Sequence, residues 1–117
     1  MVNIIKMSKE GKFVFHYNAP VLIVLAHKPV LANNFSDTAC AMENMMLACN
    51  ELDLGCCWVN QLRHLQDNER LVARLRELGM SDDEKVYASL ALGYPDLPNG
   101  LNRRELDIKG NPVTYID

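Results

Sequence analysis

The chain has 117 residues, of which 49% are hydrophobic, enough for one compact domain with limited stability to spare. Its formal charge is -3, with acidic and basic residues interspersed, and it has no basic stripe to bind a phosphate backbone, so we set nucleic acid aside as a partner. The longest apolar run, residues 19–26, is too short to cross a bilayer, and residues 1–15 lack the order of regions that marks a secretion signal. We therefore predict a single domain over residues 1–117, a cytoplasmic location and no membrane contact.

The chain opens with a lead-in, residues 1–18, of mixed charge that ends in aromatic side chains. We expect this segment to be loose and to dock by its aromatics onto the core at 19–95. Residues 20–27 then form a continuous apolar run without polar alternation, typical of a strand that is covered on both faces inside a sheet.

A long helix is predicted next, with Ser36 or Asp37 accepting hydrogen bonds from its first free amides and with its end near Leu52, just before Gly55. One broad apolar stripe on this helix consists of Ala39, Met42, Met45, Met46, Cys49 and Leu52. Cys40 and Leu47 form a second strip between polar residues. One stripe suffices on a monomer, so the second indicates a subunit interface along residues 37–52, unless both side chains are simply tolerated at the surface.

Two strands and a second helix complete the predicted core. Cys56 to Asn60 is a short apolar strand, and residues 85–92 form another. Between them, Asp67 or Asn68 can cap an amphipathic helix that ends near Leu78, where Gly79 supplies the left-handed stop. The order of elements predicts an α+β fold.

Residues 96–117 form a loop rich in Pro, Gly and Asn, followed by an extended tail. The tail at 105–117 carries five large apolar residues, which is high for a frayed end. Pairing of this tail with a second chain is the interpretation that we favour.

The sequence offers few groups for direct protein catalysis. It lacks the phosphate loops, H-E-x-x-H and G-x-S-x-G patterns of common enzyme classes, and its three histidines are scattered, so we assign no catalytic residue and no metal ligand. The four cysteines, Cys40, Cys49, Cys56 and Cys57, show no zinc-ligand spacing and are expected to be reduced and mostly buried. Cys56 and Cys57, as neighbours on a strand, should point to opposite faces.

Arg103 and Arg104 are the one basic pair placed to bind a ligand. Two guanidinium groups in a loop after a strand can clasp a phosphate by paired hydrogen bonds, although adjacent arginines in a loop are more often solvated surface.

A set of short motifs in a fixed order resembles the C-terminal half of the nitroreductase family. These are Ala-Pro and an apolar strand at 19–23, Asp37 followed by Glu-Asn-Met at 43–45, Gly-x-Cys-Trp at 55–58 and Leu-Gly-Tyr-Pro at 92–95. The resemblance implies a partial nitroreductase fold, with helices packed on an antiparallel-type sheet, a long central helix at a homodimer interface and a C-terminal tail that wraps the partner.

The same resemblance implies a function and a site. It indicates an FMN-dependent oxidoreductase in which NAD(P)H delivers hydride to the flavin, and a nitroaromatic, quinone or similar small acceptor is then reduced. The segment Trp58, Val59, Asn60 and Gln61 would run beside the isoalloxazine ring and offer it a backbone amide, while Arg103 and Arg104 would contact the FMN phosphate. The cofactor then carries the difficult chemistry, which explains why no protein acid, base or nucleophile is needed.

Two departures from the family pattern bear on activity. The family commonly has glycine near Gln61, so a glutamine there alters the expected contact with the ring. The preceding half of such proteins would carry an Arg-rich motif that binds FMN. Without that half, the strand at 20–27 would lie at an exposed edge of the sheet. The alternative function is therefore a truncated, non-catalytic dimerising remnant that binds flavin weakly or not at all.

Overall fold

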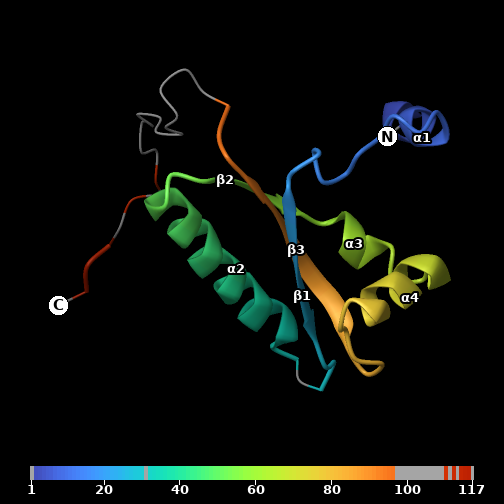
Figure 1. Cartoon of the computed structure of the whole chain (residues 1–117). Coiled ribbons are helices and arrows are strands. Elements are labelled where there is room, and N and C mark those ends of the chain that lie inside the picture. The colour runs from blue at the N-terminus through green and yellow to red at the C-terminus, as the bar shows by residue number, and fades with distance from the viewer. Residues whose placement is uncertain (1, 31, 97–109, 111, 113, 117) are drawn as a thin grey trace.

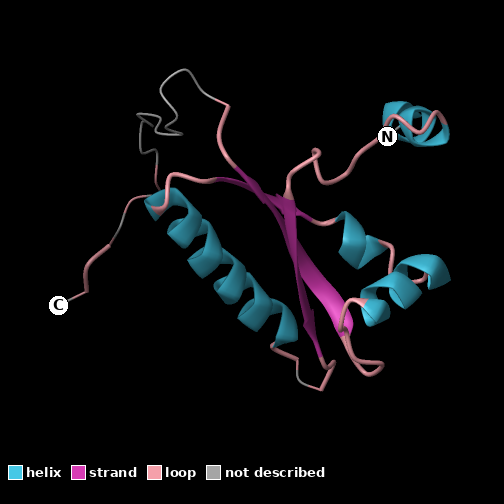
Figure 2. Cartoon of the chain, viewed as in Figure 1, coloured by secondary structure: helices cyan, strands magenta, loops and turns pink. Residues whose placement is uncertain are grey.

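The computed structural model describes residues 2–30, 32–96, 110, 112 and 114–116. Along the chain they form α1 (Val2–Lys9), β1 (Val21–His27), α2 (Asn34–Glu51), β2 (Gly55–Val59), α3 (Gln61–His64), α4 (Glu69–Glu77) and β3 (Lys85–Gly93). Figures 1 and 2 show α2 on one face of the sheet and α3 and α4 on the other, with α1 standing apart. The predicted α+β architecture is confirmed, whereas the helix in the lead-in was not expected.

The described strands form one antiparallel sheet in the order β1-β3-β2. The central strand β3 is the most buried of the three, and its residues 88–91 are all buried. β1 lies at an edge of this sheet, and its residues 22–26 are half-buried rather than fully covered. β1 is therefore an edge strand of the described sheet, and the interior position predicted for it is taken by β3.

The helix α2 packs on the sheet through the predicted apolar stripe. Met42 and Cys49 are buried and form a core cluster with Ala88 and Leu90 of β3. Leu52 was assigned to the same stripe, but it is 68% exposed. The reason is that α2 ends at Glu51 and the chain reverses through Asp53, whose φ of 54° is left-handed.

The start of α2 also differs from the prediction. Neither Ser36 nor Asp37 caps it, because the helix begins at Asn34, and its N-cap Asn33 makes no side-chain capping bond. The buried side chain of Asn34 instead donates from Nδ2 to the Lys28 carbonyl oxygen and, over 3.2 Å, to the Tyr87 hydroxyl. These contacts fasten the beginning of α2 to the sheet.

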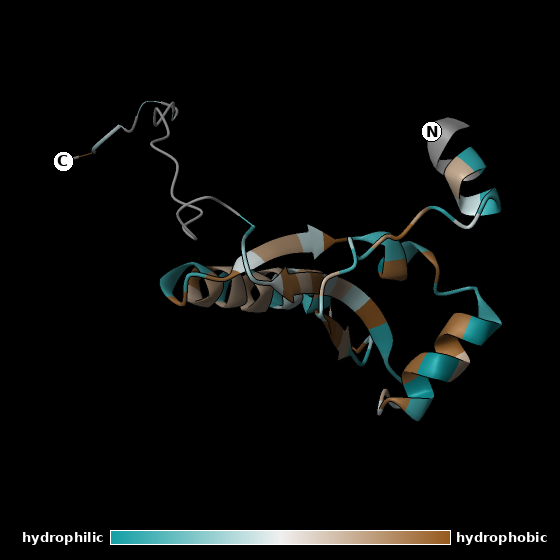
Figure 3. Cartoon of the chain, turned by 45° about the horizontal axis from the view of Figure 1, so that its top comes forward, coloured by the Kyte–Doolittle hydropathy of each residue, from teal (hydrophilic) through white to brown (hydrophobic). Residues whose placement is uncertain are grey.

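The opposite face of the sheet carries a second cluster made of Leu62, Leu75 and Val86. Phe15 of the lead-in packs against it, as expected for a segment docked by an aromatic, whereas Tyr17 is exposed. Figure 3 shows hydrophobic and hydrophilic residues alternating along α4, and its Leu71 and Leu75 pack in the second cluster, as expected of the predicted amphipathic helix. No helix in the described ranges combines the length and hydropathy needed to cross a bilayer.

Replacing Asn68 with alanine should lower the free energy of unfolding by about 1 kcal/mol, because Asn68 is the N-cap of α4 and its side chain accepts from the Leu71 amide over 3.1 Å. The sequence left Asp67 and Asn68 as alternatives for this role. Asp67→Ala is thus the matched control, with little expected change. Urea unfolding of both variants measures the difference, and an equal loss in the two would contradict this assignment of the cap.

Candidate functional site

The segment from Trp58 to Gln61 lies where β2 leaves the sheet and α3 begins. Val59, the last residue of β2, is 2% exposed, and Leu62 in α3 is buried in the second cluster. Between these anchors Asn60 is exposed and Gln61 is half-buried. The chain thus makes a short turn, residues 59–61, that is anchored by buried residues before and after it and is exposed to solvent at Asn60.

Trp58 supports this turn from the face of the sheet that α2 covers. Its indole packs against the Met42 cluster, and its Nε1 donates to Asn60 Oδ1 over 2.9 Å. Asn60 is the N-cap of α3, with φ -90° and ψ -11°, but its side chain does not cap that helix. The Asn60 side chain is instead oriented by Trp58.

Ser89 supports the turn from the opposite face, a role that was not predicted from the sequence. Ser89 lies opposite Val59 in the β2–β3 register and is 0% exposed. Its Oγ donates to the Val59 carbonyl oxygen over 2.6 Å. From the sequence we predicted only that residues 85–92 form a strand, because the role of Ser89 depends on the Val59 carbonyl that lies opposite it in the sheet.

A contact with α2 also fixes α3. The Arg63 guanidinium lies over the Phe35 ring, with 4.4 Å between its central carbon and the ring centroid. Such cation–π contacts at exposed sites contribute about 0.5 to 1 kcal/mol. Arg63 therefore links the helix after the turn to the first turn of α2.

The cysteines are free, but they are less buried than predicted. Cys49 is buried and Cys56 half-buried, whereas Cys40 and Cys57 are exposed. Cys56 packs in the cluster under α2, and Cys57 is exposed, so the prediction of opposite faces holds. Burial, followed by the neighbouring Cys49 thiol, raises the pKa of Cys56 above its ordinary value. Cys56 therefore stays protonated at neutral pH, which disfavours a role as a thiolate nucleophile.

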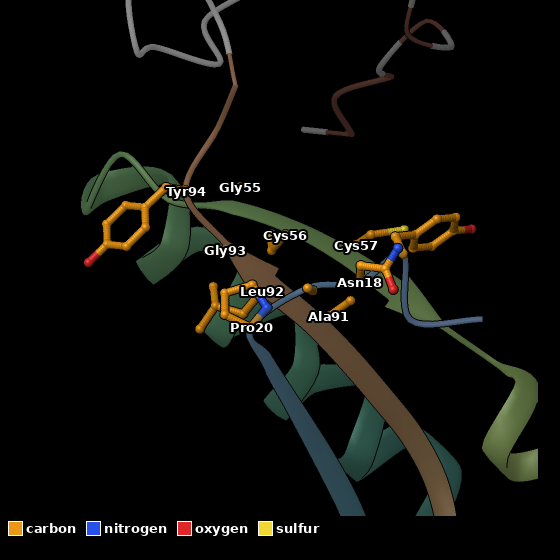
Figure 4. A pocket seen from close by; sticks show the side chains of 11 residues that line it. Asn18, Pro20, Gly55, Cys56, Cys57, Ala91, Leu92, Gly93 and Tyr94 are labelled. Carbon is orange, nitrogen blue, oxygen red and sulfur yellow. The ribbon is translucent and has the colours of Figure 1, made fainter. Parts of the chain in front are cut away.

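A hollow of about 500 Å³ lies at the other end of β2, around Gly55, Cys57, Asn18 and Tyr94 (Figure 4). It does not include the turn at 59–61. At its edge the Ala-Pro and Leu-Gly-Tyr-Pro motifs meet, because a Cβ on Gly93 would lie 3.0 Å from Pro20 Cδ. The glycine of the second motif thus makes room for the proline of the first.

The structure describes four of the six residues that were predicted to bind a cofactor. Trp58, Val59, Asn60 and Gln61 form one continuous segment at the end of β2 and the start of α3. Gln61 has no positive φ, so the backbone there does not demand the glycine common in the family. Arg103 and Arg104 lie outside the described residues, as does most of the tail at 105–117.

Comparison with known proteins decides the family. A model of the nitroreductase family matches residues 3–94, most of the chain. The chain belongs to the nitroreductase family. No curated protein matched it.

Solved nitroreductases share the fold of this chain. An FMN-bound nitroreductase from Bacteroides fragilis is 34% identical with a TM-score of 0.77, over 90% of this chain and 55% of that one. An FMN-dependent nitroreductase from Clostridium difficile is 20% identical with a TM-score of 0.63, over 94% and 69% of the two chains. The present nitroreductase chain thus spans little more than half the length of the Bacteroides protein.

Proposed function

We propose that this chain forms part of an FMN-dependent oxidoreductase that passes reducing equivalents from NAD(P)H to a nitroaromatic, a quinone or a similar small acceptor. The observation that carries the proposal is the turn at 59–61, which is anchored on both sides and open in the middle. Support comes from family membership and from the FMN bound to the Bacteroides nitroreductase, which is 34% identical.

The groups at the turn fit one polar edge of a flavin ring. Asn60 and Gln61 offer backbone N–H groups and amide side chains, which both donate and accept hydrogen bonds. The Asn60 side chain is held by Trp58, so its position is set before any ligand binds. FMN, when bound, would supply the hydride chemistry, and the protein groups would supply position and electrostatics.

Arg103 and Arg104 are proposed to hold the FMN phosphate. Guanidinium groups form paired, charge-assisted hydrogen bonds to phosphate oxygens, and these are stronger than neutral ones. In this proposal the turn at 59–61 orients the ring, and the basic pair fixes the other end of the cofactor.

We also propose that two chains associate through α2. Cys40 and Leu47 lie on the side of α2 that the sheet does not cover, and Leu47 is 59% exposed. This exposed apolar strip supports the interface predicted along residues 37–52, and the tail at 105–117 is proposed to reach over the partner.

A titration of the purified chain with FMN tests the function. We expect the flavin to co-elute with the protein and its visible absorbance to fade on anaerobic addition of NADH or NADPH. A nitroaromatic or a quinone should then restore the colour. Free FMN at the same concentration is the control for the uncatalysed reaction. A chain that stays colourless in excess FMN would refute the proposal.

A further inference from the structure

We propose that Ser89 is a positioning residue for flavin binding, acting through the Val59 carbonyl to hold the turn at 59–61 in its binding geometry. This inference rests on the proposed function and extends the site to β3, about thirty residues further along the chain than the turn. Ser89 itself need not touch the cofactor.

The Ser89 hydroxyl makes a buried hydrogen bond to the backbone. Ser89 is 0% exposed, and a hydroxyl is costly to bury without a hydrogen-bond partner. Its partner is the carbonyl of Val59, at 2.6 Å, which belongs to the last residue of β2. The Ser89 hydroxyl therefore fixes the peptide group between Val59 and Asn60 at the point where the chain leaves the sheet.

The turn is supported from each face of the sheet. Ser89 holds Val59 from the side of α3 and α4, and Trp58 holds the Asn60 side chain from the side of α2. Leu62 closes the far end by its burial in the second cluster. Loss of the Ser89 bond frees the peptide on which the exposed groups of Asn60 and Gln61 depend.

Loss of the Ser89 bond should weaken FMN binding because it makes the turn more flexible. A flexible turn pays an ordering cost each time a ligand binds, whereas a preorganised one does not. Removing one partner of a buried hydrogen bond commonly costs enough to change an equilibrium about tenfold. We therefore expect Ser89→Ala to raise the dissociation constant for FMN about tenfold.

The experiment compares Ser89→Ala and Ser89→Cys with a matched control, Thr38→Ala. Thr38 is also buried and donates from its hydroxyl to a backbone carbonyl over 2.6 Å, but that carbonyl belongs to Asn34 in the same helix, so the bond holds no residue of the turn. Cysteine replaces the hydroxyl with a larger thiol that is only a weak donor, so Ser89→Cys weakens the bond without leaving a cavity. It also serves if the alanine variant does not fold.

Two readouts are taken, one of them without flavin. In the flavin-free protein, NMR order parameters of the Val59, Asn60 and Gln61 amides should be near the rigid value of about 0.85 and should fall in both Ser89 variants. Thr38→Ala should leave them at the wild-type value. The second readout is the FMN dissociation constant, which should rise for the Ser89 variants and not for Thr38→Ala.

The outcomes separate this inference from the proposed function. Unchanged order parameters in the Ser89 variants, or the same fall in Thr38→Ala, would overturn the role of Ser89. A fall in order with no change in FMN affinity would also overturn it. If the wild-type chain binds no FMN, the proposed function fails, while the flavin-free readout still decides whether Ser89 holds the turn.

Discussion

Met42→Ala is expected to lower the free energy of unfolding by about 2 to 5 kcal/mol, a large share of what a domain of this size has available. Met42 is 0% exposed and packs with Cys49, Ala88 and Leu90, so truncation leaves a cavity between α2 and β3. Urea unfolding followed by far-UV circular dichroism measures the loss. If Met42→Ala does not fold, Met42→Leu should, because it nearly conserves volume and should cost less than about 1.5 kcal/mol.

Leu47→Ala is the matched control on the same helix. Leu47 is 59% exposed, so its truncation should barely affect the unfolding of a single chain. It should instead weaken self-association, and this effect grows with protein concentration, whereas the effect of Met42→Ala on the fold does not depend on it. Sedimentation and unfolding at two concentrations distinguish the two cases. If both variants lost the same unfolding free energy at both concentrations, the division of α2 into a core face and an interface face would be contradicted.

The double variant Arg103→Ala and Arg104→Ala is expected to weaken FMN binding by about 10² to 10⁴-fold. The estimate assigns each arginine one charge-assisted hydrogen bond to the phosphate, worth about 1.5 to 3 kcal/mol. Flavin fluorescence titration measures the dissociation constant. Riboflavin has no phosphate, so its affinity should be the same for the variant and the wild type.

The matched control for charge is the double variant Arg70→Ala and Arg74→Ala. Both arginines are exposed on α4, and Arg74 pairs with Glu77 over 2.8 Å at the surface. This change also removes two positive charges, so any general electrostatic effect on an anionic ligand should appear in both double variants. Equal losses in the two, or an equal loss for riboflavin, would contradict a phosphate contact by Arg103 and Arg104.

Elements with a strong local signal were predictable from the sequence. The apolar period of α2 correctly placed Met42 and Cys49 in the core, and Gly79, with φ 112°, is the left-handed stop predicted after α4. The segment 85–92 is a strand as predicted, although its central position in the described sheet was expected for residues 20–27 instead. Periodicity and glycine chemistry act over a few residues, so they can be recognised without tertiary information.

Features set by tertiary contacts were not predictable in the same way. The start of α2 was misplaced because Asn34 bonds to Lys28 in the preceding loop and to Tyr87 in β3, rather than to groups within the first turn. The short helix α3 has only four residues, too few for a periodic pattern. Leu52 leaves the apolar stripe because Asp53 reverses the chain.

At the candidate site, too, local motifs were predictable from the sequence and tertiary contacts were not. The motif resemblance picked out Trp58 to Gln61, which the fold places at the junction of β2 and α3. It did not indicate Ser89, because a serine in an apolar strand gains its meaning only from the Val59 carbonyl opposite it. Nor did it anticipate that the Asn60 side chain is held by Trp58 rather than capping α3.

Mapping FMN onto the chain by ¹H–¹⁵N NMR tests most directly whether the flavin binds at the turn. Addition of FMN should shift the amide and indole signals of residues 58–62, together with those of Arg103 and Arg104. Signals around the hollow at Gly55, Asn18 and Tyr94 should change far less, because that hollow lies at the opposite end of β2. Shifts confined to the hollow, or no shifts in excess FMN, would contradict a flavin site at the turn.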